Sequence, residues 1–382
     1  MTNKLFSHLS LVAILLACCG HGIAASYPTT SYKLSADGFT LEKWLGDEST
    51  VDLASDNRFS TVTTIGNDAF SARRDLREVV LSQGITTLRQ GAFSDCNMLK
   101  AITFNDALKT IGNDAFRACK GLKTIDFKNV TAVGSTAFSG CNALVEVKIP
   151  RQLTQLGYAT FYNCNRLKNF TVEDGNPAYS AIDGVLLDNK QETLIVYPRA
   201  KADTSYIVPT TVTSLEGRAF DGCRKLKTLE MGAHIATIGK NALFNCTGLN
   251  KIIIHATLPP LLQGDSPLKG INVATCRLHV PQSAINAYRQ AQLWQNFATI
   301  LPIEETSSVT AINGTANFTM SVQENRLHIN WTDTAWHHIT IYDTAGHLLY
   351  RARETGSATI SLDTHIAIVH IDNYSGKVVT IH

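Results

Sequence analysis

Several familiar catalytic and binding motifs are missing from this 382-residue chain. It contains no G-x-S-x-G, H-E-x-x-H, P-loop or G-x-G-x-x-G pattern, so it carries no signature of the common hydrolases, zinc proteases or nucleotide-binding enzymes. It has no C-x-x-C pair, which removes the usual case for a zinc site. The formal net charge is only +2, so no nucleic-acid partner is indicated. We therefore expect neither an enzyme nor a cofactor.

Long apolar runs are also lacking beyond the N-terminal segment. None approaches the ~20 apolar residues that a membrane-spanning helix needs, so we expect no transmembrane span. Residues 1–25 have the parts of a secretory signal peptide: a positive charge at Lys4, an apolar run from Leu9 to Ala17, and small residues at Ala24 and Ala25. The sequence therefore predicts an exported protein, secreted or at the cell surface.

Two routes of processing stay open for this N-terminal segment. The small residues allow ordinary cleavage after Ala24 or Ala25. The run Leu15-Leu16-Ala17-Cys18 resembles a bacterial lipobox, which implies acylation of Cys18 after cleavage before it. Leu16 departs from that pattern, because a small residue is commoner there. Ordinary cleavage is the preferred reading, and acylation would instead associate the protein with the outer membrane.

An internal repeat of about 23 residues dominates the rest of the chain. The cysteines report its period independently: Cys96, Cys119, Cys141 and Cys164 are 23, 22 and 23 residues apart, and Cys223 and Cys246 are 23 apart. Seven copies align, beginning near Thr64, Thr87, Thr110, Ala132, Gln155, Ser214 and Thr237.

The apolar positions within each copy are fixed. An aliphatic residue opens the copy, an aromatic residue follows an alanine, a leucine follows the cysteine, and an alternating pair such as Ile102 and Phe104 closes it. So small a unit cannot bury these residues alone, so neighbours must stack and share one interior. The alternating pair predicts a short strand, and stacked copies predict a parallel sheet with ~4.8 Å between strands. Glycines recur where we expect the chain to turn: Gly66, Gly112, Gly134, Gly157 and Gly239.

The repeat, written I-G-x-x-A-F-x-x-C-x-x-L-x-x-I-x-[FI], resembles the BspA-like leucine-rich repeat of bacterial surface proteins. The predicted fold is thus a leucine-rich-repeat solenoid with short parallel strands. The resemblance implies an N-terminal cap at residues 26–60, repeats at 61–277 and a capping segment at 278–303. An insertion at about 173–208 interrupts the array, and within it Val185 to Leu187 and Leu194 to Tyr197 suggest a hairpin.

The pattern changes after a polar linker at residues 304–309. Short alternating segments across residues 310–382 predict a small all-β sandwich. ITIYDTAGHLLY, followed at the end by GKVVTIH, resembles the sorting domain read by the type IX secretion system of Bacteroidetes. The chain departs from that pattern at Thr364 to Ala367, where the resemblance would place Gly-x-Tyr. A plain binding module is the alternative.

The cysteines and histidines do not predict a disulfide or a metal site. Seven cysteines lie beyond the signal segment, and an odd number cannot all pair within one chain. Because parallel Cβ vectors suit a disulfide poorly, we expect buried free thiols. Seven of the twelve histidines fall between His328 and His382, but strand alternation sends neighbours to opposite faces, so we expect no metal site.

One surface feature suggests a binding role. The residue after the repeated leucine is basic in five of seven copies, and stacking would align these side chains as a stripe, hereafter the basic stripe: Arg77, Lys100, Lys123, Lys168 and Lys227. The functional interpretation is an anionic protein segment or glycan bound with salt sensitivity. The alternative is an ordinary solvated edge interleaved with Glu78, Asp126, Glu146 and Glu230.

Three functions follow from these patterns. The leading one is an adhesion or interaction protein, and the resemblance implies host or bacterial surface molecules as partners. The second is a carbohydrate-binding accessory protein, in which Tyr158, Tyr162 and Tyr179 would stack on sugars. The third, an enzyme with an unrecognised site between Gly175 and Pro209, has no motif behind it.

Overall fold

A computed structural model describes residues 26–264, 266–303, 318–323, 326–331, 333–343, 348–361, 366–371 and 374–380. These residues form two units, one ending at Pro302 and one beginning at Ile303. The expected signal peptide, Cys18 and the linker at 304–309 lie outside the described residues. Of the helices in the described part of the chain, none has the length and apolar character needed to cross a bilayer.

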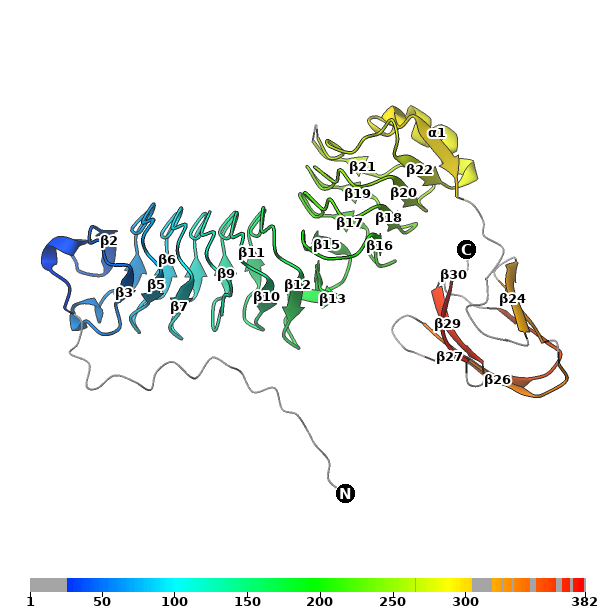
Figure 1. Ribbon diagram of the computed structural model, residues 1–382, viewed down its shortest axis with the longest axis horizontal. Helices are drawn as coiled ribbons and strands as arrows, with labels where there is room; N and C mark the ends of the chain where they lie inside the picture. The colour runs from blue at the N-terminus through cyan, green and yellow to red at the C-terminus, as the bar shows by residue number, and fades with distance from the viewer. Residues whose placement is uncertain are drawn as a thin grey trace, which may run out of the picture. The chain divides into compact units, whose positions relative to one another are not determined.

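The first unit is a solenoid in which most repeats contribute two short strands, and each of these strands pairs in parallel with its counterpart in a neighbouring repeat (Figure 1). The opening residues form β4 (Thr64–Ile65), β6 (Thr87–Leu88), β8 (Thr110–Ile111), β9 (Ala132–Val133) and β11 (Gln155–Leu156). The alternating pairs form β5 (Glu78–Val80), β7 (Ala101–Thr103), β10 (Glu146–Ile149) and β12 (Asn169–Val172). Thr64 pairs with Thr87 and Thr87 with Thr110, so the register between strands equals the repeat period. The predicted parallel stacking is confirmed.

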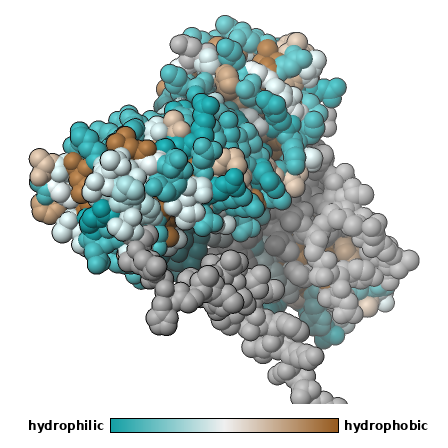
Figure 2. All heavy atoms as spheres, turned by 60° about the vertical axis from the view of Figure 1, so that its left-hand side comes forward, coloured by the Kyte–Doolittle hydropathy of each residue, from teal (hydrophilic) through white to brown (hydrophobic). Residues whose placement is uncertain are grey.

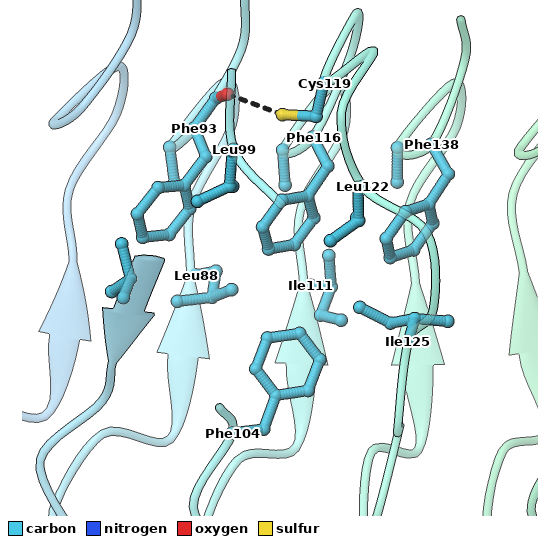
Figure 3. Packing of buried hydrophobic residues seen from close by; sticks show 14 of the residues in the cluster. Leu88, Phe93, Leu99, Phe104, Ile111, Phe116, Cys119, Leu122, Ile125 and Phe138 are labelled. Atoms are coloured by element: carbon cyan, nitrogen blue, oxygen red, sulfur yellow. Dashed lines mark hydrogen bonds between the residues drawn. The ribbon is translucent and has the colours of Figure 1, made fainter. Parts of the chain in front are cut away.

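A column of phenylalanine rings runs through the interior (Figure 3). The ring centroids of Phe93 and Phe116 are 5.3 Å apart and nearly parallel, and those of Phe116 and Phe138 are 5.2 Å apart. Leucines from the same repeats, such as Leu99 and Leu122, are fully buried beside them. The repeated aromatic position therefore holds successive repeats together through ring stacking as well as apolar burial.

The repeated cysteine bonds to the preceding repeat. Cys119 Sγ donates to the carbonyl oxygen of Phe93 at 3.1 Å (Figure 3). Cys141 Sγ likewise donates to the carbonyl oxygen of Phe116 at 3.2 Å. All seven described cysteines are free and buried, as expected. Cysteine suits this position because it is nearly as apolar as alanine yet satisfies a buried carbonyl.

The segment before the repeats closes the first end of this interior. It comprises η1 (Thr29–Ser31), β1 (Tyr32–Leu34), β2 (Thr40–Trp44), β3 (Thr50–Asp52) and η2 (Asn57–Phe59). Strand β2 pairs in parallel with β4, and the Trp44 ring stacks on Phe70 at 5.4 Å. Trp44 thus extends the phenylalanine column by one position.

The repeated glycines are required for a reason other than the expected turn. Gly134 and Gly157 are not among the residues with positive φ. A Cβ built on Gly157 would lie 2.2 Å from Ser135 N, and one on Gly134 would lie 2.5 Å from Asn113 N. The backbones of adjacent repeats approach too closely at this point for any side chain.

The segment expected as an insertion contains a three-stranded antiparallel meander of β13 (Tyr179–Ile182), β14 (Val185–Asp188) and β15 (Thr193–Val196). The expected hairpin is therefore present. Strand β15 also pairs in parallel with β17 (Ser214–Leu215), and β16 (Ser205–Ile207) pairs in parallel with β18 (Thr228–Met231). The segment thus supplies the first turn of a second stack, and the repeats form two stacks, separated at β13 and β14 (Figure 1).

The second stack continues through the last repeat into the closing segment. Its remaining strands are β19 (Thr237–Ile238), β20 (Lys251–Ile254), β21 (Leu261–Leu262), β22 (Arg277–Val280) and β23 (Thr299–Pro302). Three helices lie between β22 and β23: η3 (Gln282–Ala284), α1 (Ile285–Gln290) and η4 (Trp294–Asn296). Tyr288 and Trp294 are buried there and donate to the carbonyl oxygens of Ala256 and Pro260, which closes the apolar interior.

The second unit is built of antiparallel strands in two sheets. One contains β24 (Phe318–Gln323), β25 (Arg326–Trp331) and β28 (Ser357–Ser361). The other contains β26 (His337–Tyr342), β27 (Leu348–Glu354), β29 (Ile366–Ile371) and β30 (Tyr374–Thr380). Leu327 and Ile360 from the first sheet share a core with Ile339 and Val369 from the second. This arrangement is the expected all-β fold, although Thr364, His365 and the last two residues lie outside the described part.

Candidate functional site

The residues of the basic stripe each stand just before an outer strand or its equivalent, and all are exposed. Arg77 precedes β5 and Lys100 precedes β7, and the Lys100 amide donates to the Arg77 carbonyl oxygen at 2.8 Å. These two side chains therefore belong to adjacent repeats and lie next to each other. Lys123 has the same repeat position, but no strand follows it in the structure.

The remaining members of the stripe are separated from these. The Lys168 amide donates to Val145, so its neighbour in the stack is apolar. Lys227 belongs to the second stack, where it lies between Thr204 and Asn250. The structure therefore brings Arg77 and Lys100 together but does not extend them into one line of five.

Acidic residues flank the basic ones, as the alternative interpretation expects. Glu78 and Glu146 are exposed beside the stripe, and Lys148 forms an ion pair with Glu173 at 2.7 Å. None of the five stripe residues forms an ion pair within the described ranges. On the face shown in Figure 2, hydrophilic residues cover most of the solenoid. Arg77 and Lys100 thus offer a small basic patch on a polar surface.

A cavity of about 290 Å³ lies where the first stack ends and the second begins. One wall is the last turn of the first stack, residues 156–167, and the other includes residues 195–199 and 216–221. The three tyrosines considered for sugar binding, Tyr158, Tyr162 and Tyr179, all line it. We call this space the junction cavity.

The tyrosines do not offer three free rings. The Arg218 guanidinium carbon lies 4.1 Å from the centroid of the Tyr162 ring, and that of Arg199 lies 5.8 Å away. The Tyr179 hydroxyl accepts from the Leu156 amide and donates to the Thr154 carbonyl oxygen, so it satisfies the edge of β11. Tyr158 is the most exposed of the three, at 45%.

Two arginines and one aspartate join the walls of the junction cavity. Asp221 is buried and accepts hydrogen bonds from Arg199 at 2.8 Å and from Arg218 at 2.5 Å. Arg199 reaches across to the side-chain oxygens of Asn163 and Asn165. Burial by itself would lower the pKa of Arg218, but the hydrogen bond to Asp221 and the charge interactions with Asp221, Tyr158 and Tyr162 together raise this pKa.

Sequence reasoning missed these residues. Arg218 and Asp221 belong to the copy that begins near Ser214, at positions where the other copies carry varied residues. Arg199 lies within the segment expected as an insertion. Arg199 and Arg218 come together only in the folded structure, where the first stack ends beside the start of the second. In the described part of the chain, no cluster of three or more His, Cys, Asp or Glu could hold a metal ion.

The repeats of the solenoid are similar to a known repeat family. A family model for the BspA type leucine rich repeat region matches six copies at residues 55–178 and 200–262. Over these residues the repeats of the solenoid are therefore similar to the BspA-type leucine-rich repeat. A comparison with curated proteins finds no match.

Solved structures of bacterial leucine-rich-repeat proteins resemble this chain at low identity. The pneumococcal vaccine antigen PcpA is 19% identical over 72% of this chain and 83% of that one, with a TM-score of 0.48. The leucine rich repeat protein of T. pallidum is 22% identical over 56% and 88%, with a TM-score of 0.39. A protein of Bacteroides ovatus is 17% identical over 72% and 98%, with a TM-score of 0.35.

Proposed function

We propose that this protein is exported and acts as a non-enzymatic interaction protein that binds extracellular proteins, including surface molecules of a host or of other bacteria. The observation that carries this proposal is the alternating burial along the outer strands. In β10, Glu146 and Lys148 are exposed while Val147 and Ile149 are buried. Repetition of this pattern in successive turns leaves an extended polar face free for contact and a filled interior.

The absence of a catalytic motif in the sequence also supports a binding role. A leucine-rich-repeat solenoid is a scaffold whose function lies in the surface it presents, and large partners suit an extended face better than a small substrate does. Patches of like charge on such a face speed association and favour partners of opposite charge. Arg77 and Lys100 are the basic pair best placed for this.

The route of export is part of the proposal. Cleavage after Ala24 or Ala25 would release the protein, whereas acylation of Cys18 would hold it at the outer membrane. A C-terminal unit acting as a type IX sorting domain would be removed after transport. Mass spectrometry of the mature protein tests all of these, because a lipid on Cys18, a free residue 25 or 26, and a shortened C-terminus have distinct masses.

Binding is tested by immobilising the full chain and measuring capture of purified extracellular matrix and bacterial surface proteins. We expect saturable binding to at least one of them, and binding to none would contradict the proposal. Any partner found is then titrated at rising salt against Arg77→Glu/Lys100→Glu. The matched control is Lys190→Glu/Arg289→Glu, which makes the same charge change at exposed residues elsewhere.

If the basic pair contributes, the stripe variant binds at least about tenfold more weakly at low salt, and the difference shrinks as salt screens the charges. Equal affinities for the stripe and control variants would remove Arg77 and Lys100 from the binding surface.

A further inference from the structure

The junction cavity borders a turn whose outward backbone N–H groups lack the acceptors that serve the four turns before it. In most turns, three backbone N–H groups at alternate residues donate to carbonyl oxygens of the next turn. In the turn before the cavity, the amides of Thr136, Phe138 and Gly140 donate to Tyr158, Thr160 and Tyr162 at 2.7–3.0 Å. One repeat further on, the equivalent groups are those of Ala159, Phe161 and Asn163, and the register predicts that they point to the turn that would follow.

That following turn is absent, because the chain enters the meander of β13–β15 instead. Among the residues that the structure describes, no hydrogen-bond acceptor reaches the N–H groups of Ala159, Phe161 or Asn163. All three residues line the junction cavity. The neighbouring strand β11 does have an acceptor, because the Tyr179 hydroxyl accepts a hydrogen bond from the Leu156 amide. Hydrogen-bond donors at the edge of a buried ladder are costly to leave without an acceptor.

The opposite wall offers a complementary group. In the second stack, carbonyl oxygens equivalent to those of Tyr158, Thr160 and Tyr162 belong to Gly217, Ala219 and Asp221. Ala219 accepts from the Tyr197 amide and Asp221 from Arg199 Nε, but the Gly217 carbonyl has no donor in the described part of the chain. The cavity is therefore a gap in the hydrogen-bond ladder, with donors on one side and an acceptor on the other.

Charge and ring geometry restrict what fills this gap. The formal charges of Arg199, Arg218, Asp221 and Glu216 sum to zero, which argues against a multiply charged anion. The face of Tyr162 next to Arg218 is covered, which weakens the case for a stacked sugar. A neutral peptide backbone supplies carbonyl oxygens at alternate residues, as the next turn does everywhere else.

We propose that the junction cavity binds an extended peptide segment of a partner protein, which completes the missing turn with its backbone carbonyl oxygens. The carbonyl groups of alternate residues accept from Ala159, Phe161 and Asn163, and a peptide N–H donates to Gly217. Arg199 closes the Asn163 end through its bonds to Asn163 and Asn165. An apolar side chain enters between Phe161 and Tyr197, which both line the cavity. This inference rests on the proposed protein-binding function and gives it a site.

The chain itself supplies a probe. Its residues Gly134–Gly140, GSTAFSG, carry the carbonyl groups of Ser135, Ala137 and Ser139, which accept from the preceding turn within the solenoid. A synthetic capped peptide of this sequence presents the acceptors that the gap lacks. The measurement is hydrogen–deuterium exchange of the full chain, with and without saturating peptide.

We expect the amides of Ala159, Phe161 and Asn163 to exchange fast in the free protein and at least about tenfold more slowly with the peptide. The equivalent amides of Thr136, Phe138 and Gly140 are expected to stay unchanged. Fast exchange that the peptide leaves unaltered would refute the site. Slow exchange in the free protein would mean that the chain fills its own gap, which also refutes it. Slowing by a neutral disaccharide such as cellobiose, but not by the peptide, would assign the cavity to a glycan instead.

A pair of variants separates binding in the cavity from binding elsewhere. Val196 lines the cavity and is partly buried, so Val196→Trp fills it, whereas Ile207→Trp adds the same side chain at a position that is 50% exposed outside it. We expect only Val196→Trp to abolish the slowing, and equal slowing in both variants would refute the assignment. If whole-protein partners are captured but residues 159–163 never respond, this inference fails and the proposed function stands. If the peptide binds in the cavity but no extracellular protein is captured, the peptide site stands and the proposed function fails.

Discussion

Arg218 lies over the ring of Tyr162, with its guanidinium carbon 4.1 Å from the ring centroid. This contact joins the last turn of the first stack to the first full repeat of the second. The two stacks have separate apolar cores that meet at β14, where Leu186 belongs to one core and Val185 and Leu187 to the other. The junction is therefore held by polar and cation–π contacts as well as by the apolar meander.

Replacing Asp221 with Asn tests this junction. Asp221 forms ion pairs with both Arg199 and Arg218, and its side chain is 4% exposed, so the variant leaves two cations close together with one weak acceptor. We expect the free energy of unfolding to fall by about 3 kcal/mol, measured by chemical denaturation. Asp174→Asn is the control, since Asp174 is exposed and makes no ion pair in the described part of the chain. Equal stability of the two variants would show that the network does not hold the junction.

The phenylalanine column gives a second prediction. Phe116 is fully buried, stacks on both Phe93 and Phe138 and also meets the ring of Phe104, so Phe116→Ala removes three ring contacts and leaves a cavity. We expect a loss of about 3–5 kcal/mol in the free energy of unfolding. Phe116→Leu is the matched variant, because the last repeat carries Leu243 at this position, fully buried. The leucine variant is expected to lose less than half as much, and a loss as large as that of alanine would show that leucine cannot fill the site.

Much of the solenoid was predictable from the sequence because its stabilising contacts recur at a fixed spacing along the chain. The spacing of Phe93, Phe116 and Phe138 alone implies that the three rings stack, and the cysteine spacing gives the register. Residues in the second unit, such as Leu327 and Ile339, follow strand alternation in the same way. Each of these predictions depends only on which neighbours a repeated or alternating pattern brings together.

The junction was not predictable, because it depends on how the pattern stops. A sequence with an extra 36 residues between Cys164 and Cys223 does not say whether the array continues past a bulge or restarts. In the structure it restarts at β15, and this break separates Lys168 from Lys227 in the basic stripe. It also opens the edge at Ala159 and Phe161. The proposed peptide site therefore exists through an irregularity that no repeat pattern encodes.

The close approach of adjacent turns gives a third prediction. A Cβ on Gly157 would lie 2.2 Å from Ser135 N, a backbone atom that cannot move alone, so Gly157→Ala forces neighbouring turns apart. We expect a loss of about 1–3 kcal/mol and a lower melting temperature. Gly232→Ala is the control, since the nearest atom to its Cβ is 3.6 Å away and its φ is not positive. A control variant as unstable as Gly157→Ala would point to a general cost of replacing glycine.

The buried thiols predict how stability depends on alkaline pH. Burial raises the pKa of Cys96, Cys164 and Cys246 to about 12 from an ordinary value of 9.0. In the unfolded chain these thiols ionise above pH 9, whereas the folded protein keeps them protonated until about pH 12. The stabilising contribution is therefore complete below pH 9 and is lost between pH 9 and 12, because the unfolded state is favoured as its thiols release protons.

A single variant isolates this effect from the ionisation of tyrosines and lysines. Each thiol contributes a slope of up to about 1.4 kcal/mol per pH unit above its unfolded pKa, so Cys164→Ala should lose stability less steeply than the parent between pH 9 and 11. Denaturation curves at four pH values measure this slope. At pH 8, a thiol reagent such as Ellman's should leave all seven buried cysteines of the folded protein unmodified and react with them once denaturant is added. Rapid modification of the folded protein at Cys164, together with an unchanged slope in the variant, would mean that the turn before the junction opens readily to solvent.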